Sequence, residues 1–288
     1  MALTRLRAWL PGQTLIARLL AIPVLVTGAF VMSVSQAAAG PTENLRDLPD
    51  IRKAGALRVG ADPTSGLPYF ARPDAASEPV GFEADLARAL GRRLGLKITF
   101  LPTAWRVLPQ ALVEGQIDVV LNAQEIRSGG GMRFTRPYYL ASQAIVTREE
   151  VRGLYTLADL AGRQVAVTTG SVGMAVASRL KPPAKLVECP DTDGPFNALR
   201  EKRAEAVVLE SAMVQAWLAR QPRGFRLVGR PILPRPYGMA VRSSSKQLLA
   251  ALDAELAALK HHGAHRRLLK THHLWDAIQG EAIAAPAR

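Results

Sequence analysis

The chain has 288 residues, 37 of them Lys or Arg and 24 Asp or Glu, which gives a formal net charge of +13. The basic residues are scattered without a long Lys/Arg run, which argues against a nucleic-acid partner and favours general surface charge. The only cysteine, Cys189, excludes an internal disulfide, so the fold must depend on its hydrophobic core.

The N-terminal residues 1–39 have the pattern of a signal peptide. Three arginines, with no acidic residue, accompany a mostly apolar stretch over residues 19–34, and the sequence AAA at 37–39 fits a cleavage site. No cysteine follows, which excludes a bacterial lipid anchor at that site. We therefore expect a periplasmic protein cleaved after Ala39. Its remaining 249 residues, with a charge of about +10, are enough for two domains of about 100–150 residues each.

Strands and helices alternate in the first half of the chain. The predicted elements are strand 57–60, helix 82–94, strand 97–101, helix 107–114 and strand 117–121. In the first helix, apolar residues recur every fourth position from Phe82 to Leu94, and Gly95 follows where a positive φ is wanted. This order predicts an α/β fold with a mostly parallel sheet covered by helices on both faces.

The second half repeats this plan. The predicted elements are a helical turn at 156–162, strand 164–168, helix 174–180, helix 196–202, strand 205–209, helix 211–219, strand 237–241 and an amphipathic helix over 248–259. The end of the chain, residues 276–288, is expected to be a flexible tail.

Motifs in both halves carry a family resemblance. In the first half they are LRVGADPT at 57–64, GFEADLARALGRRLG at 81–95, GQIDVVL at 115–121 and RFTRPYY at 133–139. In the second half they are LADLAG at 157–162, VAVTTGS at 165–171, AVVLE at 206–210 and GMAVR at 238–242. Their order resembles the family 3 extracellular solute-binding proteins, the periplasmic receptors of polar amino-acid ABC importers.

The resemblance implies the two-lobed, type II periplasmic-binding-protein fold, with two strands crossing between the lobes. By position, lobe 1 would comprise residues 41–141 plus 238–275 and lobe 2 residues 142–237, with crossings near 140–143 and 236–239. It also implies a monomeric receptor that is not an enzyme, has no cofactor or metal, captures a small amino acid or related carboxylate by lobe closure, and delivers it to an inner-membrane ABC permease.

In the family, an arginine on lobe 1 forks onto the ligand carboxylate, and Arg127 is the best match here, with Arg133 as the alternative. The segment 122–132 departs from the family pattern. It is shorter, lacks the usual Ser/Thr lead-in, and has three glycines where a helical turn normally lies. Asp62 is a further predicted ligand contact, and the family also often places an aromatic ring near it, where this chain has Ser65. Tyr69 or Trp105 would then supply that wall of the site.

On lobe 2, Ser171 precedes a helix, where it can cap the helix, and the free N–H groups there can also bind an anion. Glu210 ends a strand where the family carries an acid that pairs with the ligand ammonium. The alternative interpretation of Glu210 is an exposed acid at a helix start. The five histidines lie in the C-terminal helices. His261 and His265 share a helix face, which we interpret as a solvated basic face rather than a metal site.

Two alternatives rest on the same resemblance. Periplasmic cyclohexadienyl dehydratases are similar to these receptors and use a cleft acid to expel a leaving group from prephenate or arogenate, a role that Glu210 could fill if burial raised its pKa. Other receptors of this family serve alcohol-oxidising quinoprotein systems, and the segment RPYY at 136–139 is compatible with them.

Overall fold

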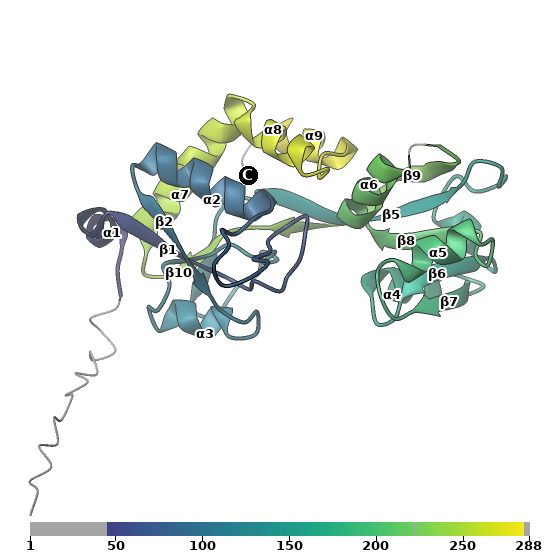
Figure 1. Cartoon of the computed structure of the whole chain (residues 1–288), viewed down its shortest axis with the longest axis horizontal. Helices are drawn as coiled ribbons and strands as arrows, with labels where there is room; N and C mark the ends of the chain where they lie inside the picture. Colours follow the sequence, from purple (N-terminus) through teal and green to yellow (C-terminus); the bar gives the residue numbers. More distant parts are fainter. Residues whose placement is uncertain (1–44, 222, 285–288) are drawn as a thin grey trace, which may run out of the picture. The chain divides into compact units, whose positions relative to one another are not determined.

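The computed structural model describes residues 45–221 and 223–284, all of which belong to one compact unit. The predicted signal peptide lies outside the described residues. Two five-stranded sheets, each flanked by helices, organise this part of the chain (Figure 1). We call the part built around the first sheet lobe 1 and the part built around the second sheet lobe 2.

The sheet of lobe 1 has the strand order β2-β1-β3-β10-β4. The bounds of these strands are β1 Ala56–Ala61, β2 Lys97–Pro102, β3 Val119–Val120, β4 Met132–Phe134 and β10 Ala240–Arg242. The pairs β1–β2 and β1–β3 are parallel, whereas β10 pairs antiparallel with β3 and β4. The sheet is therefore mixed, because a strand from the far end of the chain is inserted between two strands of the first half.

Helices cover both faces of this sheet. Their bounds are α1 Leu48–Ala54, α2 Phe82–Leu94, α3 Leu108–Val113, α7 Lys246–His261 and α8 Ala264–Thr271. Helices α1, α2, α7 and α8 contact one another around the main hydrophobic core, and α3 packs with β1, β3 and β10 around a separate core (Figure 1).

Helix α2 forms as its sequence predicts. Phe82, Leu86 and Leu90 are fully buried along one stripe, and Gly95 ends the helix with φ of 68°. Gly91 lies on the helix where it approaches β2, because a Cβ there would meet the Cγ1 atom of Ile98 at 2.7 Å. The helix can approach the sheet this closely only with glycine at this position.

The sheet of lobe 2 has the order β7-β6-β8-β5-β9. Its strands are β5 Tyr139–Arg148, β6 Gln164–Thr168, β7 Lys185–Cys189, β8 Ala206–Glu210 and β9 Phe225–Tyr237. Its helices are α4 Val172–Ser178, α5 Gly194–Arg200, α6 Ser211–Arg220 and the 3₁₀ turn Ala158–Leu160. Helices α5 and α6 share one hydrophobic core, while α4 and the 3₁₀ turn belong to the other. This sheet is mixed too, with β6 parallel to β7 and β8, and β5 antiparallel to β8 and β9.

Strands β5 and β9 carry the chain between the two sheets. They pair antiparallel from Tyr139↔Tyr237 onward, and β5 follows β4 of lobe 1 while β9 leads into β10 of lobe 1. Strand β9 forms the edge of its sheet and contains three prolines, at positions 231, 234 and 236. The two connections between the lobes therefore lie side by side.

Two sequence predictions need correction. Residues Ala277–Ala284, predicted to be part of a flexible tail, form helix α9, and Gln279 bonds to both the N–H (3.1 Å) and the C=O (2.8 Å) of Leu140. His265 is buried instead of solvated, and its Nε2 donates to the carbonyl of Tyr138 at 2.7 Å. Both errors arise because residues distant in sequence bury these groups. In the described part of the chain, no helix is long and apolar enough to cross a membrane.

Candidate functional site

A cavity of about 240 Å³ lies where loops of lobe 1 meet the crossing strand β9. Its lining residues come from the loop before α3, the loop after β3 and the end of β9; they are Trp105, Ala123, Gln124, Glu125, Arg127, Arg235 and Tyr237. We call this cavity the arginine pocket. It brings together two residues predicted from the sequence, Arg127 and Trp105.

The loop after β3 is fixed against β9 by backbone bonds. The N–H of Ile126 donates to the carbonyl of Pro236 (2.8 Å), and the N–H of Gly238 donates to the carbonyl of Gln124 (2.9 Å). Glu125 forms an isolated β-bridge with Tyr237. The position of the pocket-lining loop is therefore tied to the strand that links the lobes.

Buried Glu83 holds the start of this loop. Its Oε1 atom accepts from the N–H of Ala123 at 2.6 Å and from the hydroxyl of Tyr138, whereas Oε2 has no partner within the described residues. Burial raises the pKa of Glu83 to about 7, although the hydrogen bonds to Tyr138 and Ala123 oppose the rise. The group is thus poised to change charge near neutral pH.

Asp62 positions the loop that carries Trp105. Its carboxylate accepts from the backbone N–H of Trp105 (2.8 Å) and from the N–H (2.8 Å) and hydroxyl (2.6 Å) of Thr64. Burial pushes the pKa of Asp62 upward, but the hydrogen bonds from Thr64 and Trp105 together outweigh it and lower the pKa. These bonds occupy the carboxylate, and Asp62 is not among the residues that line the arginine pocket.

Arg127 lies at the arginine pocket with its side chain exposed, and its guanidinium makes no hydrogen bond or ion pair to any described residue. The alternative, Arg133, lies on the edge strand β4 and does not line this pocket. After Arg127, Gly129, Gly130 and Gly131 have φ values of 96°, 70° and 71°. Three consecutive residues in this region cannot form the right-handed helical turn expected in the family, which accounts for the altered segment 122–132.

Trp105 and Tyr69 occupy different environments. Trp105 is half exposed and lines the arginine pocket. Tyr69 is buried, and its ring packs against Tyr139 and Tyr237 at centroid distances of 5.7 and 6.1 Å. Tyr237 is therefore the aromatic residue that connects the wall of the pocket with the buried tyrosine cluster.

The Tyr69 hydroxyl donates to Oε1 of Glu210, a bond that joins lobe 1 to lobe 2. Glu210 ends β8 immediately before α6. Burial raises its pKa, while the Tyr69 hydrogen bond and the charge of Arg235 lower it in part. Glu210 is thus partly buried beside the crossing strands and electrostatically coupled to Arg235.

Ser171 caps α4, as one of its two sequence interpretations predicts. Its hydroxyl accepts from the N–H of Met174 at 3.1 Å. It does not line the arginine pocket in this structure. Ser171 and Glu210 thus lie on lobe 2, while Arg127, Trp105, Tyr69 and Asp62 lie on lobe 1.

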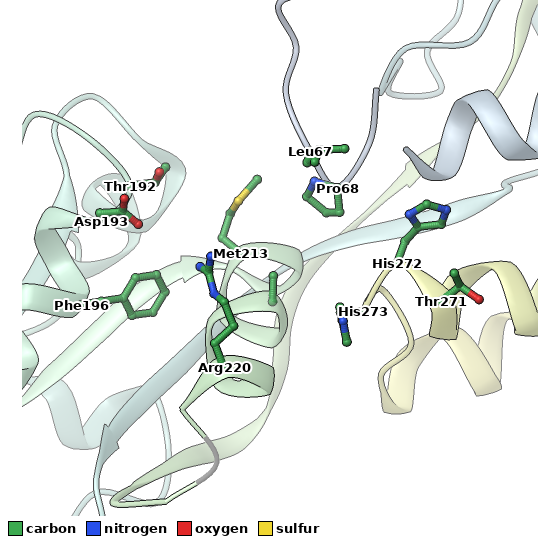
Figure 2. Close-up of a pocket in the computed structure, with 11 residues that line it drawn as sticks. Leu67, Pro68, Thr192, Asp193, Phe196, Met213, Arg220, Thr271, His272 and His273 are labelled. Atoms are coloured by element: carbon green, nitrogen blue, oxygen red, sulfur yellow. The ribbon is translucent and has the colours of Figure 1, made fainter. Parts of the chain in front are cut away.

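A second cavity, of about 390 Å³, also has walls from both lobes (Figure 2). Leu67 and Pro68, next to Tyr69, and residues 271–273 come from lobe 1, and Phe196, Met213 and Arg220 come from lobe 2. None of the six residues predicted as ligand contacts lines it. No group of three or more His, Cys, Asp and Glu side chains placed for a metal ion occurs among the described residues.

Sequence reasoning missed five residues of the arginine pocket, and three of them, Glu125, Arg235 and Tyr237, carry a charged or aromatic side chain. Glu125 and Tyr237 are brought together only by the β-bridge between distant segments, and Arg235 reaches the pocket from β9. The only sequence signal for Arg235 and Tyr237 was their place next to the expected return crossing at 236–239.

Known proteins resemble this chain over most of its length. Residues 57–274 match the model of the bacterial extracellular solute-binding proteins, family 3. The ABC transporter arginine-binding protein 1 of Escherichia coli (strain K12) is 27% identical over 221 residues, which is 75% of this chain and 90% of that protein. The histidine-binding periplasmic protein of Salmonella typhimurium is 24% identical over 78% of this chain and 90% of its own length.

Solved structures show the same relationship. An ancestral cationic amino acid solute-binding protein has a TM-score of 0.68 and 28% identity, covering 78% of this chain and 98% of its own. An ancestral arginine-binding protein bound to arginine has a TM-score of 0.54 and 30% identity, covering 76% of this chain and 98% of its own. Together with the two mixed sheets, the two crossing strands and the match over residues 57–274, these likenesses show that the chain belongs to the family 3 bacterial extracellular solute-binding proteins.

Proposed function

We propose that this protein is a periplasmic receptor that captures an amino acid and delivers it to an ABC importer, without catalysing a reaction. The observation that carries the proposal is the arginine pocket, where a free guanidinium and an exposed tryptophan lie beside the strands that join the lobes. Several relatives are named for binding arginine, histidine or cystine. A small zwitterion with an apolar or charged side chain fits these surroundings.

In the proposed complex, Arg127 binds the ligand carboxylate and Glu210 the ligand ammonium. The two side chains come from opposite lobes, so one ligand must draw the lobes together to touch both. Closure about β5 and β9 would then be favoured by contacts that exist only in the closed state. Trp105 would cover the ligand side chain, and Ser171, at the start of α4, would approach the ligand carboxylate only after closure.

The remaining parts of the proposal concern the whole protein. We propose that export by the N-terminal segment places the mature chain, from Gly40, in the periplasm. Lobe 1 would comprise residues 41–141 and 238–275, and lobe 2 residues 142–237, with α9 packed on the crossing strands. The partner would be an inner-membrane ABC permease, and the receptor would act as a monomer without binding nucleic acid.

A second candidate function is a dehydratase acting on prephenate or arogenate. The observation in its favour is Glu210, a partly buried carboxyl whose pKa is raised and which accepts a hydrogen bond from Tyr69. One structural neighbour, 28% identical with a TM-score of 0.57, is described as an ancestral amino-acid-binding protein that is a precursor of cyclohexadienyl dehydratase. A protonated carboxyl can act as a general acid, but no further group placed for catalysis supports this candidate among residues 45–221 and 223–284.

A thermal-shift screen distinguishes the two functions. The mature protein, unfolded and refolded to remove carried-over ligand, is heated with each amino acid, with prephenate and with arogenate. A ligand at about 100 times its Kd adds about 2.7 kcal/mol to the stability, a shift of several degrees. A shift with an amino acid supports the receptor. Turnover of prephenate or arogenate that is lost in Glu210→Gln would replace the receptor with the enzyme.

A further inference from the structure

Arg235 is a second cation in the arginine pocket, and it comes from the crossing strand β9. Its Nη1 atom lies 3.7 Å from Oε2 of Glu125, which is within ion-pair range but longer than a normal hydrogen bond. Its Nε–H is buried without an acceptor among the described residues. A buried donor without a partner is costly, so the protein alone does not satisfy this guanidinium.

Arg235 also lies among acidic groups from both lobes. Glu125, on the lobe 1 loop, faces it across the pocket, and Glu210, on lobe 2, is influenced by its charge. The side chains of Arg235 and Glu125 are 32% and 50% exposed, so both can exchange their partners for a ligand. The loop of Glu125 is held by the backbone of β9, which keeps this carboxylate next to Arg235.

We propose that Arg235 holds the ligand carboxylate together with Arg127, and that Glu125 occupies the carboxylate position when no ligand is bound. This inference rests on the proposed receptor function and adds two specificity-determining residues to it. A planar guanidinium accommodates a carboxylate through two parallel charge-assisted bonds, which are shorter than the 3.7 Å contact that Glu125 makes. The ligand carboxylate therefore displaces Glu125 by forming better bonds.

Because Arg235 lies on β9, a ligand that displaces Glu125 becomes bound to a strand that joins the two lobes. Arg235 pairs in register with Ala141 of β5, at the point where the two crossing strands run together. A ligand bound to Arg235 is thus attached to the hinge itself, as well as to lobe 1 through Arg127. The ligand class that this arrangement selects is a free α-carboxylate, whatever the side chain.

The test measures Kd by isothermal titration calorimetry on the refolded mature protein and its variants. The probes are L-arginine, L-histidine and L-cystine, and, for whichever binds the wild type, the matching amino-acid amide, which lacks the carboxylate. Arg235→Gln should weaken binding of the free amino acid by at least about tenfold, because it removes charge-assisted bonds. Arg235→Lys should recover part of the lost affinity, since lysine restores the positive charge but not the two parallel N–H donors of the guanidinium. Arg230→Gln, on the same strand outside the pocket, is the matched control and should keep the wild-type Kd.

Glu125→Gln gives the sharpest result, because it should tighten binding by about threefold or more as the internal competitor is removed. The amide should bind wild type and Arg235→Gln about equally, since the group that Arg235 recognises is absent. Unchanged Kd in Arg235→Gln, or weaker binding in Glu125→Gln, would overturn the inference while the receptor function stands. Failure of the wild type to bind any amino acid would overturn the receptor function itself. Thermal unfolding of each variant without ligand verifies that it is folded.

Discussion

At the residue scale, the arginine pocket contains two arginines that have few contacts to other side chains of the protein. Arg127 has no partner among the described residues, and Arg235 has only a long contact to Glu125. By contrast, Arg46 and Arg58 both bond to the buried carboxylate of Asp118, and Arg242 donates to the carbonyls of Leu112 and Ile117. Arg46, Arg58 and Arg242 are therefore held by partners within lobe 1, whereas Arg127 is not.

Replacing Arg127 should affect binding and leave the fold unchanged. We expect Arg127→Gln to weaken amino-acid binding by more than about tenfold, because a charge-assisted pair of bonds is lost. Its free energy of unfolding without ligand should stay within about 0.5 kcal/mol of wild type, as for other exposed residues. Calorimetric titration and urea unfolding measure both quantities. Arg133→Gln is the matched control. Loss of binding in Arg133→Gln and not in Arg127→Gln would transfer the carboxylate role to Arg133.

Glu83 and His265 are buried and both hydrogen-bond to Tyr138, yet they should give opposite dependences of stability on pH. The pKa of Glu83 rises from 4.5 to about 7 on folding, so the folded state binds more protons in this window and stability falls as pH increases. The pKa of His265 falls from 6.5 to about 4 through burial, so the unfolded state binds more protons and stability rises over that window. Between about pH 4.5 and 6.5 the two effects should largely cancel.

The cancellation can be removed by one substitution. The free energy of unfolding of Glu83→Gln, minus that of wild type, should increase by ~3 kcal/mol from pH 4.5 to pH 7. This increase is the stability that wild type loses as Glu83 gives up its proton. Urea unfolding at half-unit pH intervals measures the difference. Parallel profiles for wild type and Glu83→Gln would show that Glu83 has an ordinary pKa in the folded state.

At the element scale, the sequence predicted helices with a regular apolar stripe much better than it predicted the crossing strands. Helix α2 appeared from Phe82 to Leu94 as expected, because its stripe and the glycine at its end are local signals. Strand β9 was predicted only at its end, near residue 236, because its three prolines argue against a strand unless it lies at a sheet edge, and edge position is a tertiary property. Arg235 and Glu125 were missed because only the pairing of distant segments brings them together, which is also a tertiary property.

The same substitution should have opposite effects in two helices. A Cβ at Gly91 of α2 would lie 2.8 Å from the carbonyl oxygen of Leu96, so Gly91→Ala should destabilise the protein by about 1–3 kcal/mol. At Gly280 of α9 the nearest atom is a Trp275 ring carbon at 3.6 Å, so Gly280→Ala should stabilise it by about 0.5–1 kcal/mol. Urea unfolding of the two variants measures both values. Equal effects in the two variants would mean that helix propensity alone decides them.

At the scale of the whole molecule, the contacts between lobes are concentrated near the crossing strands. Tyr69 bonds to Glu210, and Ser211 donates to Asp276 at 2.8 Å just before α9. Gln279 of α9 then bonds to Leu140 on β5. Helix α9 thus packs on both strands that join the lobes.

Ligand binding should make the protein more compact. If the ligand must contact Arg127 and Glu210 together, a saturating amino acid should lower the radius of gyration measured by small-angle X-ray scattering. Arg127→Gln at the same ligand concentration should show a smaller change, because less of it is occupied. Saturation proved by calorimetry with an unchanged scattering profile would indicate that capture occurs without lobe closure.

The prolines of β9 have a consequence for association between molecules. Proline has no N–H, so positions 231, 234 and 236 give the exposed edge of lobe 2 few donors for pairing with a strand of another molecule. With one cysteine, the chain also lacks an internal disulfide that would restrict its unfolded states. Strand β9, which joins the two lobes, is therefore also a poor template for joining molecules edge to edge into aggregates.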